Sequence, residues 1–111
     1  MLFGEGEERR DHVAVDDIAD MVLRIVLHRS TGIVNAVTGD VVSFRTLAEF
    51  IAAQFAPPVP INGSPRVGHM PHNGLRPFAP SAALAAFPGF TFTPWREGVA
   101  TMCAETRAEK K

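Results

Sequence analysis

The sequence predicts a mixed α/β fold in which short strands alternate with about four helices. Three observations predict it. A period-two pattern at residues 9–16 changes abruptly to a helical pattern. A short segment rich in β-branched residues and bounded by glycines precedes a second helical stripe. Proline stands at the first turn of each of two later helical segments.

The first strand leads directly into the first helix. Val13 and Val15 fall on one side of the strand, and His12, Ala14 and Asp16 fall on the other. Asp16 and Asp17 follow as an N-cap acceptor and a first-turn carboxylate of a helix predicted over 17–28. The apolar stripe of this helix contains Ile18, Met21, Val22, Ile25 and Val26.

The middle of the chain predicts a strand over 33–37 and then a second helix. Ser43 is a good N-cap for that helix, and Pro57 lies beyond its end. Its stripe is formed by Phe44, Leu47, Ala48, Ile51 and Phe55. Another short strand is predicted over 59–62.

The last third of the chain predicts a long loop and two helices. Residues 65–77 are dense in glycine, proline, histidine and arginine, and a loop of this length in a small domain is functional or disordered. A short helix is predicted over 80–86. The final helix is predicted to be capped by Thr93, with a buried face of Trp95, Val99, Met102 and Cys103.

The composition restricts the classes of partner. Eleven basic residues balance twelve acidic ones, so no overall field attracts the chain to nucleic acid or to an anionic membrane. No apolar run has the length of a membrane span. A single cysteine, Cys103, cannot form an internal disulfide. We therefore expect a cytoplasmic protein that binds neither nucleic acid nor membranes.

One run of residues resembles a known family. Gly4-Glu5-Gly6 is followed by Arg10-Asp11 and then by a Val-Asp-Asp-x-Ala segment that ends at Ala19. This arrangement is similar to the hinge of the NAD-dependent epimerase/dehydratase family, the extended short-chain dehydrogenases that act on nucleotide sugars. The resemblance implies the C-terminal, substrate-binding segment of that fold, without its Rossmann half. It divides the chain into an entry loop (1–9), the substrate-binding segment (10–107) and a charged tail (108–111).

The resemblance implies a role for Arg10. The matching arginine of the family contacts the pyrophosphate of the nucleotide sugar, and the planar guanidinium group suits a phosphate. The structural alternative is a salt bridge from Arg10 to Asp11 or Asp17.

Further substrate-binding residues are implied in the long loop. Its Arg-x-Gly-His segment resembles the family segment that closes over the nucleotide. Arg66 would contact a phosphate or ribose, Gly68 would let the backbone approach the ligand, and His69 would stack on the base or donate a hydrogen bond. Arg76 aligns with a further family arginine. The structural alternative for Arg66 is an exposed loop residue.

The catalytic groups of the family are missing. The chain has no tyrosine, and its only lysines are Lys110 and Lys111, so the Tyr-x-x-x-Lys dyad is not in this chain. No strand leads into a glycine-rich turn that could hold a dinucleotide. His69 and His72 have no third metal ligand close in sequence. We therefore assign no catalytic, cofactor-binding or metal-binding residue, although the family implies NAD or NADP for the complete enzyme.

Two functions and one further possibility follow. The first is the nucleoside diphosphate sugar-binding portion of such an enzyme, catalytically incomplete alone. The alternative is a non-enzymatic interaction or regulatory module that docks on a cofactor-binding domain or a second copy through the surface left by the missing Rossmann domain. A third is a truncated reading frame, because Met1-Leu2-Phe3 directly precedes the entry loop.

Overall fold

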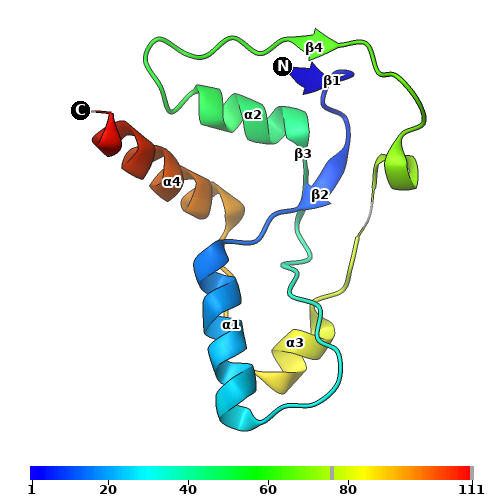
Figure 1. Cartoon of the computed structure of the whole chain (residues 1–111), viewed down its shortest axis with the longest axis vertical. Coiled ribbons are helices and arrows are strands. Elements are labelled where there is room, and N and C mark those ends of the chain that lie inside the picture. The colour runs from blue at the N-terminus through cyan, green and yellow to red at the C-terminus, as the bar shows by residue number, and fades with distance from the viewer. Residues whose placement is uncertain (76, 111) are drawn as a thin grey trace.

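The fold is a small mixed α/β arrangement, as the sequence predicts. A computed structural model describes residues 1–75 and 77–110, and Figure 1 shows the order of the elements. The helices are α1 (Val15–His28), α2 (Phe44–Ala52), α3 (Ser81–Ala86) and α4 (Trp95–Glu109), with a short 3-10 helix at Pro71–Gly74. The strands are β1 (Leu2–Phe3), β2 (Arg9–Asp11), β3 (Val41–Ser43) and β4 (Gly63–Ser64).

The strands form two separate pairs. β2 runs antiparallel to β3, with Arg10 opposite Val42. β1 runs parallel to β4, with Leu2 opposite Gly63. Because each pair is only two or three residues long, the sheets join segments that are distant in sequence rather than forming a broad layer.

Local signals set most of the helix boundaries. Ser43 caps α2 as predicted, since its hydroxyl accepts a hydrogen bond from the backbone N–H of Thr46 at 3.1 Å. α1 begins at Val15, two residues earlier than predicted, and its N-cap is Ala14 with no side-chain cap. The prediction that Asp16 caps α1 is therefore wrong. Thr93 does not cap α4 either, because the N-cap is Pro94.

Two predicted strands differ from the observed ones. Residues 33–37 are not a strand, because no partner segment pairs with them among the described residues. The strand predicted over 59–62 lies instead at β4, where Gly63 and Ser64 pair with β1. The entry loop itself contains a strand, β1, which the sequence analysis did not predict.

Apolar packing is divided between two places. Met21 of α1 packs with Ala83, Phe87 and Phe90 in one cluster. In the other, the rings of Phe50 in α2 and Trp95 in α4 meet edge to face at 5.3 Å. Cys103 is buried as predicted. Met102 is 62% exposed, so its predicted place on the buried face of α4 is wrong.

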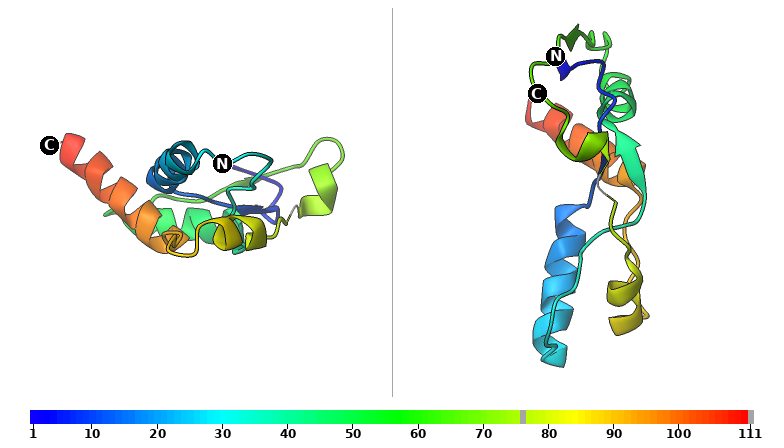
Figure 2. Two further views of the ribbon diagram at one scale, coloured as in Figure 1. Left: turned by 90° about the horizontal axis from the view of Figure 1, so that it is seen from below. Right: turned by 90° about the vertical axis from the view of Figure 1, so that its right-hand side faces the viewer.

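The molecule is a thin plate. Its principal extents are 46 × 41 × 16 Å, and the two views of Figure 2 show its thin dimension. The radius of gyration is 16.7 Å, whereas a compact domain of 100 residues has one of about 13 Å. The accessible surface is 7775 Å², against about 6,000 Å² expected for a globular protein of this mass.

No helix within 1–75 and 77–110 is long and apolar enough to cross a membrane.

Candidate functional site

The carboxylate of Glu8 lies between the side chains of Arg10 and Arg66. Arg66 Nη1 donates a hydrogen bond to Glu8 Oε1 at 3.4 Å, and Arg10 Nη2 lies 3.9 Å from Glu8 Oε2. The three side chains are only 14–27% exposed, which reduces solvent screening of the charges. The structure therefore brings two of the predicted site residues together. The sequence analysis did not identify Glu8, although an acidic residue two positions before Arg10 indicates a possible ion pair with it.

Strand pairing explains why residues so distant in sequence meet here. Arg66 follows β4, which is joined to β1 and further held by a hydrogen bond from the Ser64 hydroxyl to the Leu2 carbonyl at 2.9 Å. Further along the loop, Arg9 and Leu75 form a parallel β-bridge. The loop after β4 is thus attached to the strands at both ends, and Arg66 is held near β2.

The backbone around Glu8 is fixed against the start of α2. The backbone N–H of Phe44 donates to the Glu8 carbonyl at 2.9 Å. Gly6 allows this close approach, because it adopts a φ of +76° and a Cβ there would lie 2.9 Å from the backbone nitrogen of Arg45. The backbone of Glu8 is therefore held while its carboxylate extends toward the arginines.

The two alternative partners of Arg10 are engaged elsewhere. Asp11 accepts hydrogen bonds from the backbone N–H groups of residues 38 and 39 at 3.1 and 2.8 Å, and from the Thr38 hydroxyl at 2.8 Å. Asp17 accepts hydrogen bonds from Thr93. Neither of the salt bridges considered for Arg10 forms in the structure.

Glu7 contributes a second negative charge beside Arg66. Glu7 Oε1 lies 3.7 Å from Arg66 Nε, and the other oxygen accepts a hydrogen bond from the backbone N–H of Glu5 at 2.8 Å. Backbone hydrogen bonds from Glu7 itself and from Glu5 lower the pKa of this carboxyl below its ordinary value. Arg66 Nε is buried and has no hydrogen-bond partner among the described residues. Arg10, Arg66, Glu7 and Glu8 together carry no net charge.

The remaining predicted site residues are not part of this cluster. His69 is exposed on the loop, and no hydrogen bond or ion pair joins it to Arg10 or Arg66. Gly68 has a φ of +90° and open space around it, which leaves room for a ligand near its backbone. Arg76 lies outside the described residues.

The turn at Gly4-Glu5-Gly6 does not fit a dinucleotide. A Cβ at Gly4 would lie 2.7 Å from a carboxylate oxygen of Glu7, so a carboxylate occupies the space beside this turn that a pyrophosphate would need. The chain continues from this turn into β2 and not into a helix whose N-terminus could bind phosphate. This turn therefore does not form a cradle for NAD or NADP.

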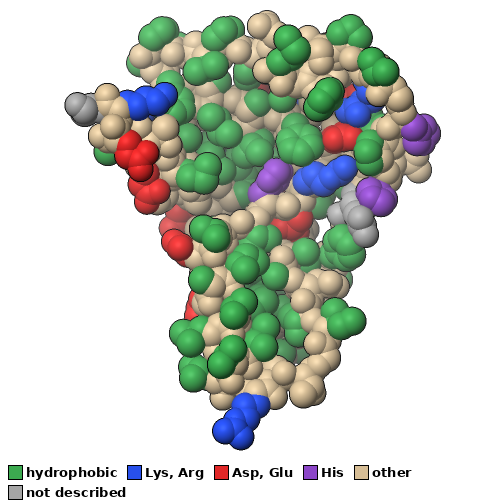
Figure 3. Space-filling view, viewed as in Figure 1, with side chains coloured by type: hydrophobic (Ala, Val, Ile, Leu, Met, Phe, Trp, Pro, Cys, Tyr) green, Lys and Arg blue, Asp and Glu red, His purple; other side chains and the backbone are tan. Residues whose placement is uncertain are grey.

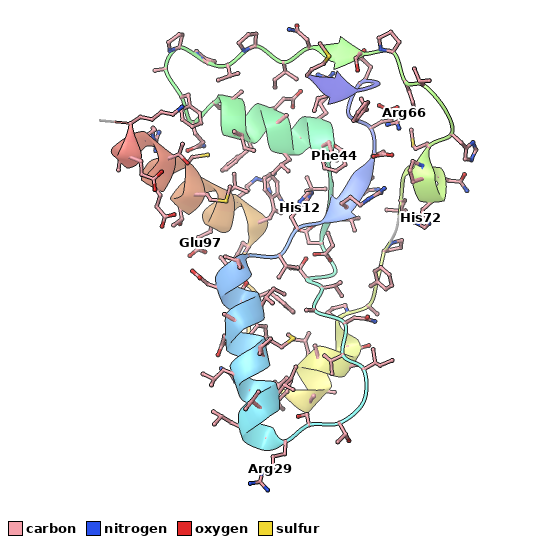
Figure 4. All side chains as sticks on the ribbon, in the orientation of Figure 1. His12, Arg29, Phe44, Arg66, His72 and Glu97 are labelled. Atoms are coloured by element: carbon pink, nitrogen blue, oxygen red, sulfur yellow. The ribbon has the colours of Figure 1, made fainter. Side chains whose placement is uncertain are left out.

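A cleft of about 580 Å³ opens between the start of α1 and the helices α2 and α4. His12 and Glu97, which are labelled in Figure 4, both line this cleft. Sequence analysis did not predict this cleft, because residues assigned to buried faces line it instead. Its mainly apolar lining includes Leu47, Ile51, Trp95, Val99 and Met102.

His12 is a titratable group of the cleft whose pKa is changed by its surroundings. Its ring meets Phe44 edge to face at 5.9 Å, and its Nε2 is buried with no hydrogen-bond partner in the described part of the chain. Burial lowers the pKa of His12 below its ordinary value of 6.5, and the nearby Asp11 carboxylate opposes this only in part. His12 is therefore neutral at physiological pH.

A second surface feature is an apolar stripe on α1 that no other element covers in the described part of the chain. The side chains of its large residues are 53–78% exposed. In Figure 3, hydrophobic side chains extend over α1 and continue toward α2 on the face shown. We call this stripe the α1 apolar face: Val15, Ala19, Val22, Leu23, Val26 and Leu27. A helix that is apolar on both its inner and its outer side is typical of a helix buried on both sides.

No cluster of three or more metal-binding side chains occurs in residues 1–75 and 77–110. Comparison with models of known protein families and with curated protein sequences gives no match to this chain.

Proposed function

We propose that this chain binds a nucleoside diphosphate, as the substrate-binding segment of an enzyme related to the NAD-dependent epimerases and dehydratases. The observation that carries the proposal is the convergence of Arg10 and Arg66 on one carboxylate, Glu8. The two arginines come from separate segments, and each directs a terminal nitrogen at the same small volume. Such an arrangement is able to hold a group with several anionic oxygens.

Diphosphate chemistry suits this pair better than a carboxylate does. Arg10 and Arg66 lie 3.9 and 3.4 Å from the oxygens of Glu8, which is longer than the roughly 2.8 Å of a tight charged hydrogen bond. A diphosphate has more oxygens, spread over a greater length, so it can contact both guanidinium groups at closer range. Its larger negative charge also favours binding to two arginines.

In this proposal, the chain does not catalyse the reaction alone. A hydride-transferring enzyme of this family needs NAD or NADP and a tyrosine that moves a proton. This chain has no tyrosine, and the Gly4-Glu5-Gly6 turn does not fit the coenzyme. In this proposal the coenzyme and the proton-transferring group belong to another domain or chain, and the complex works in the cytoplasm.

A second candidate function is a protein-interaction module. Two observations favour it: the plate is 16 Å thick, and the α1 apolar face is exposed. Monomers rarely expose a contiguous apolar surface of this kind unless it is an interface. In this reading the chain docks on another domain or on a second copy, and the arginine pair has a structural role.

One experiment distinguishes the two candidates. The purified chain is analysed by size-exclusion chromatography with light scattering, and UDP, GDP, ADP and uridine are titrated in by calorimetry. A monomer that binds at least one diphosphate, but not uridine, supports the first function. A stable dimer that is indifferent to every diphosphate supports the second. Reduction of NAD or NADP by the chain with a nucleotide sugar, without a partner, would refute the statement that it is catalytically incomplete.

A further inference from the structure

We propose that Glu8 is an internal competitor that weakens the binding of every anionic ligand to the arginine pair. Its carboxylate occupies the place between Arg10 and Arg66 that an anionic ligand must take. A ligand therefore binds only when it is charged enough to displace Glu8. This inference rests on the proposed function and deepens it, since only ligands that bind the two arginines strongly, such as diphosphates, still bind when Glu8 competes.

The contacts of Glu8 show that it occupies the site rather than lying beside it. Each of its two oxygens faces a different arginine, and the side chain is only 14% exposed. Both contacts are longer than a tight charged hydrogen bond, which is about 2.8 Å. The carboxylate thus neutralises the pair without satisfying it well.

Charge determines which ligands can displace Glu8. With Glu7 and Glu8 in place, the cluster has two positive and two negative charges. An incoming anion of similar charge to a carboxylate gains little by exchange with Glu8. A diphosphate brings more charge and more acceptor oxygens, so its gain exceeds the cost of displacing the carboxylate.

Glu8 can move away while the rest of the site stays in place. Its backbone carbonyl is held by the N–H of Phe44 at 2.9 Å, but its side chain reaches the arginines through rotatable bonds. Glu7 differs, because its carboxylate is attached to the backbone N–H of Glu5 at 2.8 Å. Glu8 is therefore the carboxylate that a ligand would displace.

The test compares pyrophosphate with phosphate in the wild-type chain and in Glu8→Gln. Calorimetric titration at low ionic strength should show that E8Q binds pyrophosphate about tenfold more tightly than wild type, because a competing charge has been removed. The affinity for phosphate should increase by a similar factor, because each ligand must displace the same carboxylate. Glu8→Ala, which removes the carboxylate without adding an amide, should show the same changes.

Glu49→Gln is the matched control. Glu49 is an exposed acid on α2 that lies near Arg45, so its replacement removes one negative charge away from Arg10 and Arg66. It should change either affinity by less than about twofold. Circular dichroism of each variant verifies that the fold is retained.

The possible outcomes separate the two proposals. Binding of pyrophosphate to wild type with equal or weaker binding to E8Q and E8A would overturn the competitor role, because Glu8 would then position the arginines. Absence of pyrophosphate and phosphate binding in wild type, E8Q and E8A would contradict the competitor role and the proposed function together.

Discussion

The carboxylate of Asp17 accepts hydrogen bonds from both the backbone N–H and the hydroxyl of Thr93, at 2.7 and 2.9 Å, across 76 residues of sequence. These bonds join the first turn of α1 to the segment that enters α4. The start of α1 and the start of α4 also form one end of the cleft. The Asp17–Thr93 contact therefore maintains the geometry of that cleft in a plate with little core.

Removal of the Asp17–Thr93 contact should destabilise the chain. Hydrogen bonds to a charged acceptor contribute about 1.5–3 kcal/mol, so Asp17→Ala should lower the free energy of unfolding by that amount in urea denaturation. Asp16→Ala is the control, because Asp16 lies in the same first turn but is exposed. Equal effects of D16A and D17A would show that both acids act only through the helix dipole.

Met21 and Val22 are neighbours on α1 with opposite environments. Met21 is 2% exposed and packs against Phe87 and Phe90, whereas Val22 is 53% exposed on the α1 apolar face. Met21→Ala should cost about 2–5 kcal/mol because it leaves a cavity. Val22→Ala should change stability by no more than about 0.5 kcal/mol. A large effect of V22A in a monomeric sample would show that the α1 apolar face is covered by the chain itself.

The stability of the chain should decrease in mild acid through His12. Folding lowers the pKa of His12 below its ordinary value of 6.5, so the unfolded chain binds a proton that the folded chain does not. The contribution is fully present above pH 6.5 and is lost as the pH falls toward the folded-state pKa. His12→Gln should flatten this part of the stability–pH curve, as measured by thermal unfolding across the range. The exposed His69 is the control, and H69Q should leave the curve unchanged.

Local sequence signals predicted the parts of the fold that depend on local interactions. The α2 cap follows from Ser43, and the short helix α3 follows from an alanine-rich run that begins with Pro80. The strand predicted over 33–37 fails because β-branched residues form a strand only where a partner segment lies beside them, and none does among the described residues. Asp17 lies in the first turn of α1 as predicted, but its hydrogen bonds to Thr93 come from far along the chain and no local pattern predicts them.

The candidate site was predicted in part. The sequence indicated Arg10 and Arg66 separately, and the structure adds that both meet at Glu8. Sequence periodicity cannot predict this contact, because the contact depends on the β1–β4 pairing and on the bridge from Arg9 to Leu75. The sequence did not predict that Met102 is exposed, since an apolar residue on a helix does not indicate whether another element covers it.

Titration of UDP, GDP and ADP into the wild-type chain and into R10Q and R66Q tests most directly whether the arginine pair binds a diphosphate. Wild type should bind at least one of them, and each substitution should weaken that binding about tenfold or more, because a charged hydrogen bond is lost. R29Q is the control, because Arg29 extends from the far end of α1 (Figure 4) and should leave the affinity unchanged. Absence of binding by wild type, or an equal loss in R29Q, would contradict the account.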